Sequence, residues 1–245
     1  MDTDIRNQIV IPDNHIDYHI KTYSNIELAA FFSKNKNNLK ILEKLLSQNN
    51  NKNNTTELLL RTIHREGSTA SIDAIKLLIE YGGDVNCTCY KDDYSLLIHC
   101  CMYPLTNIKI TKLLIESGAD VNNKSKTRTP LMYFIKNCSK NEDLEIIKLL
   151  VRKTKINHKD RYGKTPLMLC FESFNNIVIR NDIIKILLDN KADIYIKNNY
   201  DRNILNILED AFIRDSKFYS LIFNYKNIDN DHYCEFDVNF IYNFF

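Results

Sequence analysis

The sequence predicts an all-α solenoid, in which helix–turn–helix units with hairpin-like fingers stack side by side. The first observation is a phrase of eleven residues, KLLIESGADVN, at Lys112–Asn122. The second is the return of this phrase, in altered form, from Lys76, Lys148 and Lys185, so that the lysines lie 36 or 37 residues apart. A fixed period of this length is typical of repeat proteins, whose units bury their apolar faces against one another.

Each phrase has the pattern of an amphipathic helix end followed by a short extended segment. In the copy at Lys112–Asn122, the apolar residues Leu113, Leu114 and Val121 need apolar neighbours. Gly118 stands where a helix end favours a residue that tolerates a positive φ. The phrase therefore predicts a helix, a stop at the glycine, and a finger that leads to the next unit.

The residues before position 55 are expected to precede the regular units. Residues 1–22 lack helical periodicity, so an N-terminal arm is expected there. Residues 23–54 predict a capping pair of helices, over 25–32 and 39–46, followed by an asparagine-rich loop at 49–54. Such a cap covers the apolar face that the first repeat would otherwise expose to water.

The regular units follow over residues 55–200, as about four copies. Their first helices are expected to begin near Thr56, Ser95, Thr129 and Thr165. A serine or threonine hydroxyl can cap the unpaired N–H groups at a helix start. The proline that follows two of these threonines fits the first helical turn, because no N–H donor is needed there.

Beyond Asp201 the pattern decays. Residues 204–208 and 218–223 predict a last, degenerate helix pair, and residues 236–245 alternate apolar with polar side chains. We expect residues 201–245 to cap the stack, with the final segment packed on the last repeat, because exposed apolar patches are uncommon on monomers. A binding segment is the alternative for this tail.

The sequence Thr-Pro-Leu at 129–131 and 165–167, followed by a leucine-rich helix and by Gly-Ala-Asp-Val-Asn, resembles the ankyrin repeat. The resemblance implies an ankyrin-repeat solenoid with degenerate caps at both ends. The histidine that usually follows Thr-Pro-Leu is replaced by Ile98, Met132, Met168 and Asn206. In the third unit, residues 153–155 read Lys-Thr-Lys in place of Gly-Ala-Asp. These changes remove hydrogen bonds that tie the turns together, so a softer stack is expected.

Among ankyrin proteins, the chain is most similar to those of poxviruses, in its divergent repeats, its stretched loops and its Asn-, Ile- and Lys-rich composition. This resemblance implies a monomeric protein of the host cytoplasm, or nucleus, that binds a host protein and counters innate antiviral or host-range restriction. Many such proteins carry a C-terminal F-box-like segment that recruits a ubiquitin ligase. Residues 201–245 show no Leu-Pro followed by a helical pair. A substrate adapter of a host ubiquitin ligase, with a cryptic or lost tail, is the alternative.

The composition argues against several functional classes. The 5 glycines are too scattered for a phosphate-binding loop, and no window approaches the run of about 18 apolar residues that a membrane span needs. The 7 cysteines, without a secretion signal, fit a reducing compartment. No nucleophile, base and stabilising group occur together, so the chain is predicted to be no enzyme and to need no cofactor.

One cluster combines thiols with an imidazole, which are ligands that zinc prefers. This cluster consists of Cys87, Cys89, His99, Cys100 and Cys101. Its spacing matches no closed zinc site, and a cysteine in the first helix of a unit fills a small-residue position as a small hydrophobe. His15 and His19 form a weaker pair without further ligands. We therefore predict no metal ligands.

The finger tips are the predicted partner-binding surface. Its residues are Lys124, Lys126, Arg128, His158, Lys159, Arg161, Tyr162, Lys164, Lys197, Tyr200 and Arg202. Equivalent tips of a stack lie about 10 Å apart, which is the distance between packed helices, so these side chains would form a basic, tyrosine-rich strip. Arginine and tyrosine are favoured at protein-binding hot spots. Nucleic-acid binding is the weaker alternative, because the net charge is only +2.

Overall fold

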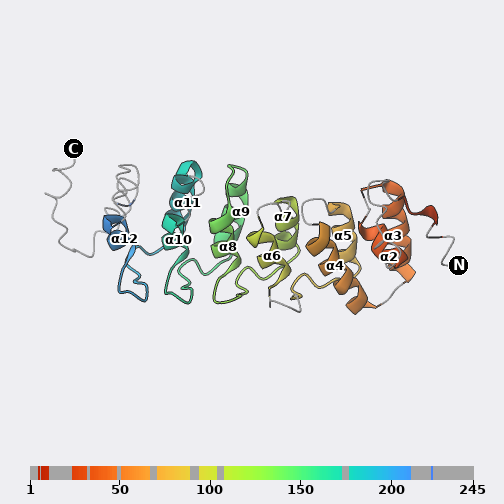
Figure 1. The fold of residues 1–245 in the computed structure, drawn as a ribbon, viewed down its shortest axis with the longest axis horizontal. Coiled ribbons are helices and arrows are strands. Elements are labelled where there is room, and N and C mark those ends of the chain that lie inside the picture. Colours follow the sequence, from red (N-terminus) through yellow and green to blue (C-terminus); the bar gives the residue numbers. More distant parts are fainter. Residues whose placement is uncertain are drawn as a thin grey trace.

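The computed structural model describes residues 5, 7–10, 24–31, 34–48, 51–66, 71–88, 94–103, 108–172, 177–210 and 222. Antiparallel helix pairs follow one another in a single row from the N-terminal to the C-terminal end of the molecule (Figure 1). The named helices are α2 (Asn25–Phe31), α3 (Lys36–Gln48), α4 (Lys52–Glu66), α5 (Ile72–Glu80), α6 (Leu96–Met102), α7 (Ile108–Glu116), α8 (Pro130–Asn137), α9 (Asp143–Val151), α10 (Pro166–Glu172), α11 (Ile177–Asp189) and α12 (Ile204–Asp210). The predicted all-α solenoid is therefore confirmed.

Two parallel layers of helices make up the stack. The first helices of the units, α4, α6, α8, α10 and α12, each contact the next and form the inner layer. The second helices, α3, α5, α7, α9 and α11, contact one another in the same order and form the outer layer. Because every unit touches only its neighbours, the stability of the stack depends on the interfaces between adjacent units.

The repeated leucine is the centre of each interface. Leu78, Leu114, Leu150 and Leu187 occupy equivalent positions in the outer helices, and each has no exposed surface. Burying one such side chain stabilises a fold by about 1.5–3 kcal/mol. The apolar ladder expected from the period is thus present, and one continuous core runs along the stack.

The inner helices begin as predicted from their capping residues. The Thr129 hydroxyl accepts a hydrogen bond from the N–H of Met132, at 3.4 Å, and the helix starts at Pro130. Ser95 caps α6 in the same way. The first inner helix differs, because α4 begins at Lys52 rather than near Thr56.

Asn51 explains the earlier start of α4. Its side-chain oxygen accepts a hydrogen bond from the N–H of Asn53, at 3.0 Å, so an asparagine in the expected loop acts as the helix cap. The expected boundary between residues 54 and 55 consequently falls inside α4.

Three of the outer helices end in the same hydrogen-bonded turn. Gly82 after α5, Gly118 after α7 and Lys191 after α11 have φ of 90°, 90° and 66°. After α7, the N–H of Ala119 donates to the carbonyl of Leu114, which is the pattern of a Schellman cap. Helix α9 lacks this turn, because Lys153-Thr154-Lys155 replaces Gly-Ala-Asp and none of the three has a positive φ.

Several predicted segments lie outside the described residues. They include most of the N-terminal arm with His15 and His19, Cys89, and the tail beyond Asp210 except Ile222, which is buried. No helix in the described part of the chain is long and apolar enough to cross a bilayer.

Candidate interaction surface

Four fingers project from between the helix pairs, along one edge of the molecule (Figure 1). We number them finger 1 (residues 81–95, of which 89–93 are not described), finger 2 (117–129), finger 3 (152–165) and finger 4 (190–203). Fingers 2, 3 and 4 each close as a tight hairpin. The closing bond runs from Ser125 to Arg128 in finger 2, from Asp160 to Lys164 in finger 3, and from Asn198 to Arg202 in finger 4.

A repeated asparagine clamp joins the base of each finger to the next finger. The side-chain oxygen of Asn122 accepts from the N–H of Lys155, at 2.9 Å, and its amide group donates to the carbonyl of Lys153, at 3.0 Å. Asn86 and Asn157 make the same pair of bonds to the backbones of fingers 2 and 4. Fingers 1 to 4 are therefore linked in series through side-chain-to-backbone bonds.

The sequence Lys-Thr-Lys changes the local bonds of finger 3 but leaves its clamp in place. Replacing Gly-Ala-Asp by Lys-Thr-Lys removes the local bond that Asp84, Asp120 and Asp193 accept from a backbone N–H two residues later. The bonds between fingers remain, because Asn122 binds the backbone of Lys153 and Lys155 whatever their side chains are.

The tips of fingers 2, 3 and 4 are also bonded to one another. The Thr127 hydroxyl accepts from the N–H of Arg161, at 2.6 Å, and its carbonyl oxygen lies 2.9 Å from Nε2 of His158. Asn199 donates its N–H to the carbonyl of Tyr162, at 3.0 Å, and its side-chain amide to the carbonyl of Arg161, at 2.9 Å. The three tips thus form one connected platform, which we call the finger platform (fingers 2, 3 and 4).

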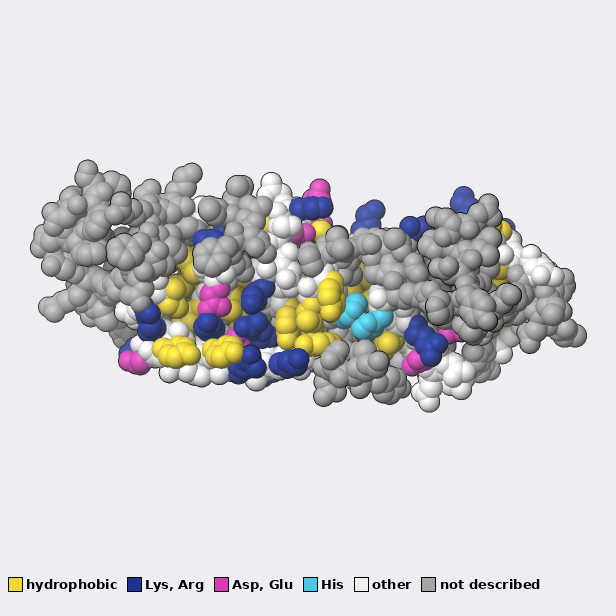
Figure 2. Space-filling view, in the orientation of Figure 1, with side chains coloured by type: hydrophobic (Ala, Val, Ile, Leu, Met, Phe, Trp, Pro, Cys, Tyr) yellow, Lys and Arg dark blue, Asp and Glu magenta, His cyan; other side chains and the backbone are white. Residues whose placement is uncertain are grey.

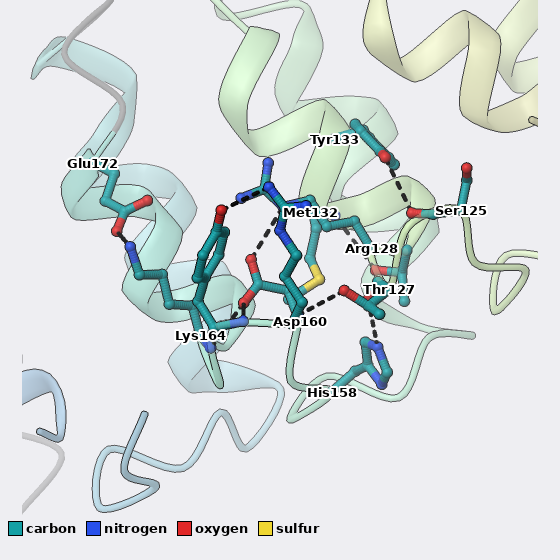
Figure 3. A network of polar contacts seen from close by, with 12 residues as sticks. Ser125, Thr127, Arg128, Met132, Tyr133, His158, Asp160, Lys164 and Glu172 are labelled. Atoms are coloured by element: carbon teal, nitrogen blue, oxygen red, sulfur yellow. Dashed lines mark hydrogen bonds and ion pairs between the residues drawn. The ribbon is translucent and has the colours of Figure 1, made fainter. Parts of the chain in front are cut away.

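The carboxylate of Asp160 organises the centre of the platform (Figure 3). The side chain has no exposed surface, and it accepts bonds from the N–H groups of Tyr162, at 2.9 Å, and Lys164, at 3.0 Å. Its second oxygen accepts from Nε of Arg128 on finger 2, at 3.1 Å. A buried carboxylate needs such donors, so Asp160 fixes both the shape of finger 3 and the position of its neighbour.

The predicted site residues divide into two groups on this platform. Those exposed to solvent are Lys124, Lys126, Lys159, Arg161, Tyr162, Lys197 and Tyr200. Those partly covered and used in internal contacts are Arg128, His158, Lys164 and Arg202. All of them lie on fingers 2, 3 and 4, so the structure brings the eleven residues together on one surface.

Tyr162 carries two cations over its ring. The guanidinium carbon of Arg161 lies 4.6 Å from the ring centre and Nζ of Lys164 lies 5.5 Å from it. Lys164 also pairs with Glu172 of α10, and Arg161 donates to the Tyr162 hydroxyl at 2.6 Å. On the neighbouring tip, Tyr200 is 69% exposed and offers an apolar ring to solvent.

An aromatic and histidine patch adjoins the platform and is formed by the inner helices α4, α6 and α8, the end of finger 1 and Tyr103. Hydrophobic side chains gather in the middle of the face shown in Figure 2, between basic side chains and histidines. The rings of Tyr94 and Tyr133 meet edge to face, with ring centres 6.1 Å apart. The ring centre of His99 lies 3.8 Å from that of His64 and 4.9 Å from that of Tyr103. Burial, with a smaller contribution from His64, lowers the pKa of His99 from 6.5 to about 4. The His99 ring is therefore uncharged near pH 7.

The cysteines of the inner helices are buried, as the small-residue interpretation requires. Cys100 and Cys170 are 3% and 2% exposed. Burial raises the pKa of Cys100 to about 12 and that of Cys170 further. Among the described residues, no three His, Cys, Asp or Glu side chains gather in a way that could hold a metal ion.

Two features of this surface were missed in the sequence. The asparagine clamp has a sequence signal, because Asn86, Asn122 and Asn157 recur 36 and 35 residues apart, but this spacing alone does not show that the side chains bind the next finger. The patch around His99 has a similar signal, because His64 and His99 lie 35 residues apart, near the ends of α4 and α6.

Comparison with known proteins identifies the family. A profile of ankyrin repeats, in three copies, matches residues 26–125 and again 107–198. This chain belongs to the ankyrin-repeat family. Ankyrin repeats are protein-interaction modules, and no catalytic family is indicated.

The curated relatives are viral ankyrin repeat proteins. One, from Acanthamoeba polyphaga mimivirus, is 32% identical over 196 residues, which cover 73% of this chain and 30% of the relative. Another, from Fowlpox virus (strain NVSL), is 32% identical over 136 residues, which cover 55% of this chain and 17% of the relative. This ankyrin chain therefore spans less than a third of the length of either protein.

Proposed function

We propose that this ankyrin protein is a non-enzymatic viral module that binds a host protein through the finger platform and the adjoining inner face. The observation that carries the proposal is the connection of fingers 2, 3 and 4 by tip-to-tip and clamp bonds. A surface held in one shape before binding loses less conformational entropy when a partner docks. The exposed lysine, arginine and tyrosine side chains supply the contacts.

The proposed biological role is to counter an innate antiviral or host-range restriction in the host cytoplasm. Its support is the similarity to ankyrin proteins of two viruses.

The proposal is tested by affinity purification from host cells, followed by direct binding measurements with the purified captured protein. The platform variant Tyr162→Ala, Tyr200→Ala removes two exposed rings without touching the bonds between fingers, which use backbone atoms of Tyr162. We expect it to weaken direct binding at least tenfold.

The control for this experiment lies on the outer layer. Lys76, Lys148 and Lys185 occupy equivalent exposed positions of α5, α9 and α11. Replacing them with alanine should leave binding within twofold of wild type. Equal loss in both variants, or no reproducible host protein, would overturn the proposal.

A further inference from the structure

The charge of fingers 2 and 3 is strongly one-sided, although the whole chain carries only +2. These two fingers contain nine basic residues and two acidic ones, Asp120 and Asp160. Asp160 is buried and already bound to Arg128, so Asp120 is the only exposed carboxylate on them. Seven of the cations are exposed and have no acidic partner within the described part of the chain: Lys124, Lys126, Arg152, Lys153, Lys155, Lys159 and Arg161.

The surfaces around these fingers do not share the excess. Finger 4 carries two carboxylates, Asp193 and Asp201, against three cations, and Asp201 pairs with Lys197 at 3.0 Å. The outer helices carry both signs, and Lys112 of α7 pairs with Glu145 of α9 at 2.5 Å. Among the described residues, the largest excess of positive charge therefore lies on fingers 2 and 3.

From this charge distribution we infer that the platform recognises an acidic, extended segment of its protein partner. The inference rests on the proposed function and adds the chemistry of the partner. Exposed charges act over about 8 Å at physiological salt, so the seven cations favour a partner whose carboxylates come close to fingers 2 and 3. Charge complementarity of this kind raises the association rate and selects the partner.

The spacing of neighbouring fingers favours a partner segment that is extended and crosses fingers 2, 3 and 4. Neighbouring packed helices lie about 10 Å apart, and an extended chain advances about 3.3 Å per residue, so one contact per finger corresponds to every third residue of the partner. The exposed rings of Tyr162 and Tyr200 belong to the successive fingers 3 and 4 and offer apolar contact beside the charged positions.

A direct test uses a fluorescein-labelled twelve-residue peptide with glutamate at every third position and leucine and serine between. A peptide of the same sequence with lysine in place of glutamate serves as the charge-reversed probe, and a twelve-nucleotide single-stranded DNA tests the nucleic-acid alternative. Fluorescence anisotropy at 50 mM salt should show the acidic peptide binding at least tenfold more tightly than the basic one. Its affinity should fall as the salt concentration rises.

The variants are chosen so that folding is not confused with binding. Lys124→Glu, Lys126→Glu, Lys159→Glu and Arg161→Glu together should reduce acidic-peptide binding at least tenfold, and the corresponding glutamine variant should reduce it less. The control reverses four exposed outer-layer lysines, Lys40, Lys76, Lys148 and Lys185, and should change binding less than twofold. Thermal unfolding by circular dichroism confirms that each variant is folded.

Several outcomes would overturn the inference. They are no binding of the acidic peptide, equal binding of both peptides, or displacement of the acidic peptide by a more tightly bound DNA. A host protein that is captured through Tyr162 and Tyr200 but keeps its affinity in the glutamine variant also overturns it, and leaves the proposed function standing. Failure to capture any host protein counts against the proposed function instead.

Discussion

Fingers 2 and 3 both close as tight hairpins, but different interactions stabilise their turns. Finger 3 has five residues from Asp160 to Lys164, and the Asp160 carboxylate binds two of the N–H groups of its own turn. Finger 2 is one residue shorter and turns through Lys126 and Thr127, with φ of 47° and 74°. Two positive φ values in a two-residue turn are typical of a type I′ hairpin, where Asn-Gly is the favoured sequence.

The difference shows that finger 2 depends on its neighbour. A β-branched residue such as Thr127 rarely adopts a positive φ, and its strain of about 1–3 kcal/mol must be compensated elsewhere. Here the hydroxyl and carbonyl of Thr127 bind Arg161 and His158, while Arg128 binds Asp160. Hydrogen bonds within finger 3 therefore stabilise its own turn, and residues of finger 3 also stabilise the turn of finger 2.

The largest effect is expected from Asp160. In Asp160→Ala, two backbone N–H groups and the largely covered Arg128 lose their acceptor, which should lower the free energy of unfolding by about 2–4 kcal/mol in urea denaturation. Asp160→Asn should cost less than half as much, because Asn198 fulfils the same role in finger 4 through its side-chain oxygen. Equal losses in the two variants would mean that Asp160 does not organise the turn.

The next largest difference is expected between two glycines, Gly163 at the tip of finger 3 and Gly118 at the end of α7. A Cβ at Gly163 would lie 2.5 Å from the side-chain oxygen of Asn199 and 2.6 Å from its backbone nitrogen, at a φ of 73°. Gly118 has a φ of 90° with nothing within 4 Å of such a Cβ. Gly163→Ala should therefore cost about 2 kcal/mol more than Gly118→Ala, which pays only the conformational cost of about 1 kcal/mol. The same denaturation experiment checks it, and equal costs would show that fingers 3 and 4 separate easily.

The strain in finger 2 predicts an unusual tolerance of glycine. Thr127→Gly loses a hydrogen bond but relieves the positive φ, so it should be about 1 kcal/mol less costly than Thr154→Gly. Thr154 is the matched control, because its hydroxyl also binds a neighbouring finger, at the carbonyl of Val121, and its φ is not positive. A larger loss at Thr127 would indicate that its strain is not released by glycine.

The smallest effect is expected from His99 of α6, which lies outside fingers 2 and 3. His99 titrates at about 4 when folded and near 6.5 when unfolded, so the unfolded state binds the proton first as the pH falls below 6.5. This titration leaves the free energy of unfolding unchanged above pH 6.5 and lowers it between about pH 6.5 and pH 4. The loss is limited because the His99 ring is partly exposed to solvent. The loss of Tm between pH 7 and pH 5 should be about 2–4 °C smaller in His99→Gln than in wild type. An unchanged loss would place the titrating group elsewhere.

The turns of fingers 2 and 3 differ in how far they can be predicted from the sequence. The composition of finger 3, with its turn sequence Asp-Arg-Tyr-Gly-Lys, predicts a tight turn at residues 160–164, and the structure has one. The turn of finger 2 was not predicted, because Lys126-Thr127 has no preference for a positive φ. The exposed tips could be named in advance, but the internal roles of Arg128 and His158 depend on atoms of another unit.

By itself, the sequence determined the period, the helices, the caps of α6 and α8 and the buried leucines, because these follow from residue spacing and from bonds between residues close in the chain. Only the tertiary structure decided which finger residues face the solvent and which hold the platform together. The clamp by Asn122 and the bond from Arg128 to Asp160 join residues 31 to 33 positions apart, and such contacts exist only once the units are stacked. The excess of basic residues on fingers 2 and 3 is visible in the sequence, and the structure adds that Asp160 is buried while seven of the cations are exposed.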